Sequence, residues 1–123
     1  MSVAVITAQE LLGLFELDPA GTVLYYRTDG DGEPSGRSTE IVGHNFYDEV
    51  VPFENVEEFR RCVTDFTRAA MAAESFDFDC RYGGSAHRVK VLLARIPESV
   101  NRNHTKSILV HIRLQESTRR SGR

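Results

Sequence analysis

The chain has 123 residues, a mass of 13.9 kDa and a formal charge of -3 at neutral pH, which is the size of one domain. Its 41% of hydrophobic and 27% of charged residues are typical of a globular protein and exclude a disordered or fibrous one. The net acidity argues against a nucleic-acid binder, and no apolar run approaches the ~20 residues needed to cross a membrane. With two cysteines and no signal-peptide pattern, we expect a cytoplasmic protein with free thiols.

The first third of the chain contains a predicted N-terminal segment and a predicted hairpin. Residues 7–10, Thr-Ala-Gln-Glu, match a capping box, so residues 1–13 are expected to hold at most a short helix. Two β-prone runs, 14–17 and 22–26, flank an Asp-Pro-Ala-Gly turn and are predicted to pair. The stretch 28–38 is rich in glycine, proline and acidic residues, which predicts a loop.

The clearest helix is predicted from Asn55 to about Ala73. Asn55 is a suitable N-cap, and Glu58 stands at the capping-box position three residues later. Apolar residues recur at spacings of three and four, which places them on one face: Val56, Phe59, Val63, Phe66 and Ala70. We therefore expect this helix to pack on a sheet through that face.

Three strands are predicted after the helix, at residues 76–82, 88–96 and 107–114. The first alternates apolar and charged residues with the period of two that a half-buried antiparallel strand requires. Residues 14–116 should form the domain, and residues 117–123 a basic tail. This order predicts an α+β fold: a five-stranded antiparallel sheet with short helices and one long helix packed on one face.

Several segments carry a further pattern. They are residues 17–26 (Leu-Asp-Pro-Ala-Gly-Thr-Val-Leu-Tyr-Tyr), Gly36 with Arg37, and residues 41–52 (Ile-Val-Gly-His-Asn-Phe-Tyr-Asp-Glu-Val-Val-Pro). Glu58 with Phe59 in the helix and Val-Lys-Val at 89–91 add to it. On these residues the chain resembles a PAS domain, and most closely the photoactive yellow protein branch of that family.

The resemblance implies a departure at the pigment site. In the photoactive yellow proteins, a cysteine directly after the proline that matches residue 52 holds a p-coumaroyl pigment through a thioester. The matching residue here is Phe53, which has no thiol to acylate. Covalent p-coumarate is therefore not expected, and no cofactor is predicted beyond an unidentified small ligand. The resemblance matches the tyrosine and arginine near the pigment to Tyr26 and Arg37.

A pocket between the sheet and the long helix is the candidate ligand site, because an apolar pocket with a few polar groups suits a small ligand. Its predicted lining is Tyr26, Arg37, Phe46, Phe53, Phe59, Val63 and Phe66. An equally open interpretation is that these aromatic side chains fill the core, with Phe53 in the volume that a pigment would need.

The cysteines and histidines form no recognisable catalytic or metal motif. Cys62 lies beside the apolar face of the helix and Cys80 shares a face with Phe78, so core packing is favoured for both. The spacing of the four histidines fits no zinc or haem pattern, and only the one near the pocket is a candidate for testing. They are His44, His87, His104 and His111.

The leading hypothesis is a noncatalytic sensory or interaction module that signals or assembles through protein contacts. Whether a small ligand also binds in an apolar pocket is left open by the sequence. A homodimer or a separate signalling protein is the expected partner, bound through the exposed sheet face and the N-terminal segment. Neither nucleic acid nor a membrane is expected. One alternative is a light sensor like the photoactive yellow proteins with a noncovalent or altered chromophore. The other is a small-molecule enzyme, for which no motif selects a reaction.

Overall fold

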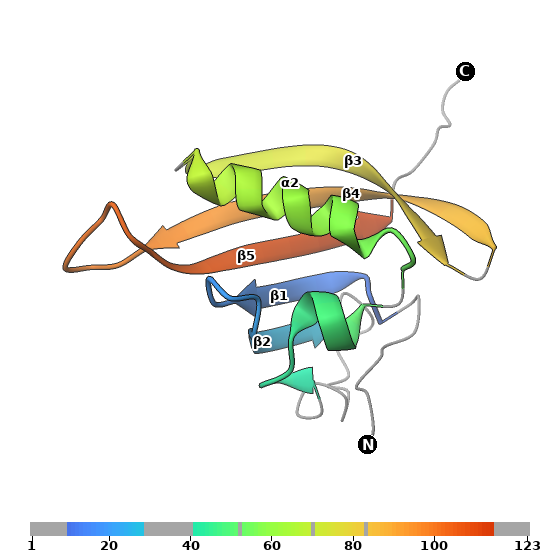
Figure 1. Cartoon of the computed structure of the whole chain (residues 1–123), viewed down its shortest axis with the longest axis horizontal. Helices are drawn as coiled ribbons and strands as arrows, with labels where there is room; N and C mark the ends of the chain where they lie inside the picture. Colours follow the sequence, from blue (N-terminus) through green and yellow to red (C-terminus); the bar gives the residue numbers. More distant parts are fainter. Residues whose placement is uncertain (1–9, 29–40, 52, 70, 83, 115–123) are drawn as a thin grey trace.

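A computed structural model describes residues 10–28, 41–51, 53–69, 71–82 and 84–114 (Figure 1). Its strands form one antiparallel sheet in the spatial order β2-β1-β5-β4-β3. They are β1 (Gly13–Leu17), β2 (Val23–Thr28), β3 (Ala73–Tyr82), β4 (Ser85–Pro97) and β5 (Thr105–Leu114). The long helix α2 (Val56–Arg68) and the short π-helix η1 (Phe46–Val50) cover one face of the sheet (Figure 1). The predicted α+β architecture is confirmed. The predicted N-terminal segment, the predicted loop at 28–38 and the basic tail fall largely or wholly outside the described residues, and Thr28 is the last residue of β2.

The turn between β1 and β2 forms as predicted and also positions η1. Asp18 Oδ1 accepts hydrogen bonds from the backbone N–H groups of Ala20 and Thr22, both at 2.9 Å. Gly21 has a φ of 98°, and a Cβ there would lie 2.8 Å from the ring of Tyr47. Two reasons therefore require glycine at this position: its backbone has a positive φ, and a side chain would collide with the Tyr47 ring.

The helix α2 ends earlier than predicted, and β3 begins earlier. The apolar pattern favoured a helix to about residue 73, whereas the helix ends at Arg68 and the strand starts at Ala73. The Arg95 N–H of β4 donates to the carbonyl oxygen of Ala72. The alanine-rich end of the predicted helix therefore pairs with the sheet instead of continuing the helix. Tertiary pairing here outweighs the helix propensity of alanine.

Asn55 does not cap α2 through its side chain. Its Oδ1 instead accepts from the Arg81 N–H at 3.0 Å, and its Nδ2 donates to the Asp79 carbonyl at 2.8 Å and to Glu58 Oε1 at 3.1 Å. The helix start is thus fastened to β3, an edge strand of the sheet. The capping-box expectation was wrong in its partner, because a backbone 24 to 26 residues away competes for the same amide.

The stretch from Gly43 to Asn55 bonds to both edge strands of the sheet. At one edge, the Val23 N–H donates to the His44 carbonyl and the Gly43 N–H donates to the Val23 carbonyl, at 2.9 and 2.8 Å. At the other edge, the N–H of residue 54 donates to the Arg81 carbonyl, next to the Asn55 bonds. Paired backbone groups at an edge are protected from pairing with another chain.

The core lies between the inner face of the sheet and the layer of α2 and η1. Apolar side chains alternate along the strands and point to this face, as the period of two predicts. Phe78 and Cys80 of β3 are buried and Phe76 is partly buried, while Asp77 and Asp79 are exposed. None of the helices in the described part of the chain is long and apolar enough to span a bilayer.

Candidate functional site

Most of the predicted pocket residues come together beneath α2, where their rings contact one another. Phe59 lies at the centre, with its ring centroid 5.9 Å from Phe46, 5.7 Å from Phe53 and 5.3 Å from Phe78. Phe53 in turn lies 5.9 Å from Phe78. These are contact distances for aromatic pairs, which favour tilted and edge-to-face geometries at about 4.5–7 Å.

The other predicted lining residues extend this cluster toward β1 and β2. The rings of Phe15 and Tyr26 stack with centroids 4.7 Å apart, and Phe15 meets Phe46 at 4.9 Å. The Tyr26 hydroxyl donates to the backbone carbonyl of Glu10. Val63 and Phe66 of α2 are both buried. Arg37 lies outside the described residues, so the pocket lining as a whole stays a prediction.

These contacts are the ones that a filled core requires. Phe53 is only 4% exposed, and its ring contacts Phe59 and Phe78. A ligand at this place would have to displace at least one of these side chains. The geometry therefore favours packing over pigment binding at Phe53.

Both thiols are held in the neutral form. Burial, assisted by the Asp79 carboxylate, raises the pKa of the Cys80 thiol from 9.0 to about 12. Burial followed by nearby Asp65 and Glu74 raises the pKa of Cys62, which is half-buried. Because the thiolate is the reactive species, these environments suit packing rather than nucleophilic chemistry.

His44, the histidine proposed for testing, is part of a local cap. Its Nδ1 lies 3.1 Å from Glu49 Oε1, and the same oxygen accepts the Asn45 N–H at 2.9 Å. The Asn45 bond, followed by the His44 bond, lowers the pKa of Glu49. Within the described ranges, no group of three or more His, Cys, Asp or Glu side chains is arranged to hold a metal ion.

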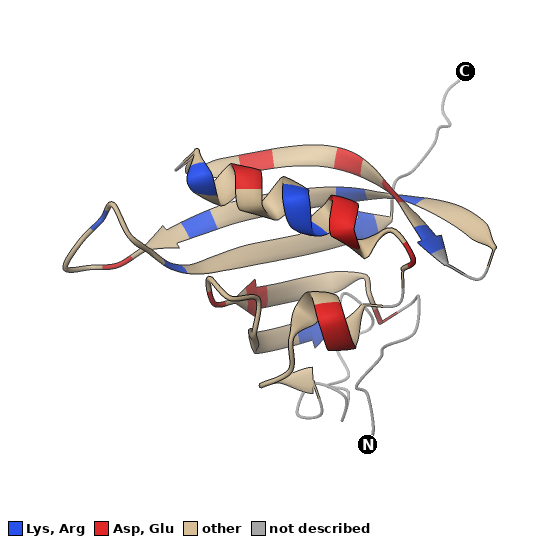
Figure 2. Ribbon diagram, viewed as in Figure 1, with Lys and Arg blue, Asp and Glu red and all other residues tan. Residues whose placement is uncertain are grey.

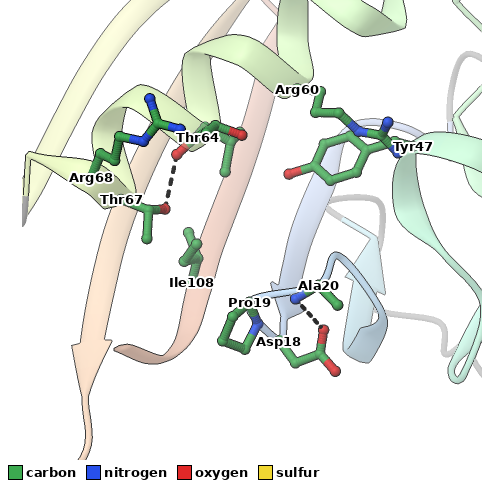
Figure 3. A pocket seen from close by; sticks show the side chains of 10 residues that line it. Asp18, Pro19, Ala20, Tyr47, Arg60, Thr64, Thr67, Arg68 and Ile108 are labelled. Carbon is green, nitrogen blue, oxygen red and sulfur yellow. Dashed lines mark hydrogen bonds between the residues drawn. The ribbon is translucent and has the colours of Figure 1, made fainter. Parts of the chain in front are cut away.

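A hollow that the sequence analysis missed lies between α2 and the β1–β2 turn (Figure 3). Its volume is about 280 Å³, and residues from four separated segments line it: Asp18, Pro19, Ala20, Tyr47, Arg60, Val63, Thr64, Thr67, Arg68 and Ile108. Of the predicted site residues that the structure describes, Val63 alone belongs to it. The spacing of Arg60, Thr64 and Arg68 at four-residue steps places them on one helix face, which is the signal the sequence does carry.

The face of the sheet opposite α2, called the outer face below, has a centre of mostly apolar side chains, with His111 and Glu16 among them. The strand register places Leu92 beside His111 and His111 beside Leu14 in one row across the sheet. The next row runs from Ala94 through Leu109 and Glu16 to Tyr25. Leu92 and Tyr25 are 43% and 45% exposed.

Charged side chains lie beside this apolar centre, mostly acidic on β3 and basic on β4 (Figure 2). Arg88 Nε lies 3.0 Å from Asp79 Oδ1, and Lys90 Nζ lies 3.8 Å from Asp77 Oδ1. These cross-strand pairs neutralise each other within the chain.

Sequence comparison finds two photoactive yellow proteins. No family model matches the chain. The chain is 35% identical over 71 residues to the protein from Rhodothalassium salexigens, a match that covers 54% of this chain and 56% of the relative. It is 26% identical over 86 residues to the protein from Cereibacter sphaeroides, covering 70% of this chain and 69% of the relative. The chain thus spans little more than half the length of the first relative.

Structure comparison finds the same fold at low identity. The photoactive yellow protein domain of the sensor histidine kinase Ppr from Rhodospirillum centenum matches with a TM-score of 0.56 and 18% identity over 87% of this chain and 97% of that one. PAS-B of Drosophila melanogaster Cycle, with bound ethylene glycol, gives 0.56 and 12% over 82% and 97%. The Vibrio cholerae VqmA dimer structure gives 0.59 and 12% over 85% and 47%. The chain therefore has the PAS fold, and its sequence is similar to those of two photoactive yellow proteins.

Proposed function

We propose that this chain is a noncatalytic sensory or interaction module that signals or assembles through protein contacts made by the outer face of its sheet. The apolar centre of that face is the observation that carries the proposal. The sensory part is supported by the likeness to a domain of a sensor histidine kinase. The noncatalytic part is supported by the environments of the two thiols, whose raised pKa values keep these nucleophiles protonated.

The outer face has the composition of a protein interface. Such interfaces combine an apolar, aromatic-containing core with a polar rim. Leu92, Leu109 and Tyr25 supply the core here, and Lys90 and Arg113 lie at its margin in the next row of the register. The layer of α2 and η1 covers the opposite face only (Figure 1).

A second copy of this chain is the partner that we propose. A twofold interface brings the same patch of both copies together, so the patch must complement itself. An apolar centre can pack against the same centre of a second copy. The charges of the Asp79–Arg88 and Asp77–Lys90 pairs are compensated within each chain, so these pairs do not repel the second copy. The VqmA structure, which shares the fold, is described as a dimer. The alternative partner is a separate signalling protein that binds the same face. We also propose that the protein is cytoplasmic.

Sedimentation velocity of the full chain and of two charge variants tests the proposal. Leu92→Glu places a carboxylate in the centre of the outer face, and we expect it to shift a wild-type dimer to monomer. Val100→Glu is the matched control, because Val100 is 95% exposed in the β4–β5 connection, and it should sediment as wild type. A monomeric wild-type chain at high concentration, together with native mass spectrometry that shows no ligand or partner, would overturn the proposal.

A light sensor with an altered chromophore site is the second candidate, and the sequence likeness to the photoactive yellow proteins favours it. The packing of Phe53 against Phe59 and Phe78 weighs against it. A visible absorption band after reconstitution with pigment would favour this candidate, whereas protein that stays colourless would exclude it.

A further inference from the structure

The hollow between α2 and the β1–β2 turn holds a buried polar group that has no hydrogen-bond partner in the part of the chain that the structure describes. Tyr47 is only 9% exposed, and its hydroxyl points into the space between the helix and the turn (Figure 3). Among the described residues, no hydrogen bond joins this hydroxyl to another group. An unpaired hydroxyl is costly to bury, so such a group calls for a ligand or a water molecule.

Tyr47 is held so that its hydroxyl can donate. Gly21 admits the ring on one side, and the Arg60 guanidinium lies 4.9 Å from the ring centroid. Burial raises the pKa of Tyr47 and outweighs the opposing effect of Arg60. The phenol therefore keeps its proton at neutral pH and presents an O–H group to the hollow.

The remaining polar groups are mostly donors. Arg68 is exposed at the end of α2, and no ion pair engages it within the described ranges. Thr64 adds a hydroxyl one helical turn earlier. Arg60 is largely committed to Asp48, at 3.0 Å, and Glu57, at 3.5 Å.

The acidic and apolar residues of the lining determine which charge and how much apolar surface a ligand can have. Asp18 is the carboxylate in the lining, and the two backbone N–H groups that bond to it reduce its repulsion of an anion. Val63 and Ile108 are 3% exposed and form an apolar floor, with Pro19 opposite. A volume of about 280 Å³ lies just below the range of drug-sized ligand pockets, which suits a smaller molecule.

We propose that this hollow binds a small organic carboxylate, whose charge meets Arg68 and the Tyr47 and Thr64 hydroxyls while its apolar body covers Val63 and Ile108. Arginine suits this role because its planar fork matches a carboxylate. The site adjoins the phenylalanine cluster, because the Tyr47 ring lies 5.5 Å from Phe46 and 6.5 Å from Phe59. It does not involve the outer face, so it stands or falls independently of the proposed dimer.

Titration of the uniformly 15N-labelled full chain with benzoate, followed by amide chemical shifts, tests this proposal. We expect saturable shifts confined to the amides of residues 18, 20, 47, 60–68 and 108. Benzyl alcohol, which keeps the ring without the charge, and acetate, which keeps the charge without the ring, should each bind at least about tenfold more weakly.

Three variants separate the site from general charge effects. Arg68→Gln should weaken benzoate binding about tenfold or more, and Tyr47→Phe should weaken it several-fold while the chain stays folded. Arg61→Gln removes the same charge from a helix position that does not line the hollow, and it should bind as wild type. No saturable shift at millimolar benzoate, equal affinity for benzyl alcohol, or equal losses in the Arg61 and Arg68 variants would each overturn the proposal.

Discussion

Phe53, which the sequence resemblance matches to the pigment-bearing position of the photoactive yellow proteins, is a packing residue in this structure. Its ring contacts Phe59 and Phe78 and is almost wholly removed from solvent. Burial of this kind could be anticipated from the apolar spacing of the helix beside it. The contact with Phe78 could not, because it joins residues 25 positions apart on different elements.

We predict that Phe53→Ala lowers the free energy of unfolding by about 3–5 kcal/mol, because it removes a buried ring and leaves a cavity. Urea denaturation followed by circular dichroism measures this change. Val100→Ala, at an exposed position, should change stability by less than about 0.5 kcal/mol. A loss in the Phe53 variant as small as in this control would mean that the ring does not contribute to the core.

Asn55 illustrates the same division at the scale of elements. The sequence located the start of α2 correctly to within one residue, because capping residues and apolar spacing are local signals. It did not reveal that the Asn55 amide bonds to β3, since edge-strand groups become available only after the sheet has formed. The early end of α2 has the same origin, in the ladder bond between Arg95 and Ala72.

We expect Asn55→Ala to destabilise the protein by about 1–3 kcal/mol, because the partly buried hydrogen bonds that hold the backbone of Asp79 and Arg81 are lost. Amide hydrogen exchange gives a local readout: the Arg81 N–H should exchange faster in the variant. Asn101→Ala is the control, since Asn101 is exposed and, among the described residues, accepts hydrogen bonds from the N–H groups of Asn103 and His104 in its own loop. Unchanged exchange at Arg81 would show that the amide does not secure the edge.

At the scale of the whole molecule, hydrophobic periodicity was enough for the order of elements and the α+β class. It was not enough for the strand order, because the pairing of β1 with β5 joins segments that lie more than 90 residues apart. The hollow was missed for a related reason. Its lining comes from four segments, and no local pattern announces that a turn, a short helix, a long helix and a strand will meet.

The free energy of unfolding should also decrease as the pH becomes alkaline. The folded state raises the pKa of Cys80 from 9.0 to about 12, so above pH 9 the unfolded chain releases a proton that the folded chain retains. We therefore predict that this contribution is complete below pH 9 and is lost as the pH rises toward 12. Thermal unfolding across this range should show a falling Tm. Cys80→Ala should flatten the decline, with a residual slope from Tyr47 and Cys62, whose pKa values are also raised. An equal slope in both proteins would contradict the prediction.

The stretch from Gly43 to Asn55 has a mechanical consequence. It is bonded to β2 at one end and to β3 at the other, and Phe46 and Phe53 between these ends belong to the aromatic cluster. These contacts link the aromatic cluster to both edge strands of the sheet. A displacement of the Phe46 and Phe53 rings would therefore strain the hydrogen bonds at β2 and at β3 together, so a change in the core would be felt at both edges of the sheet.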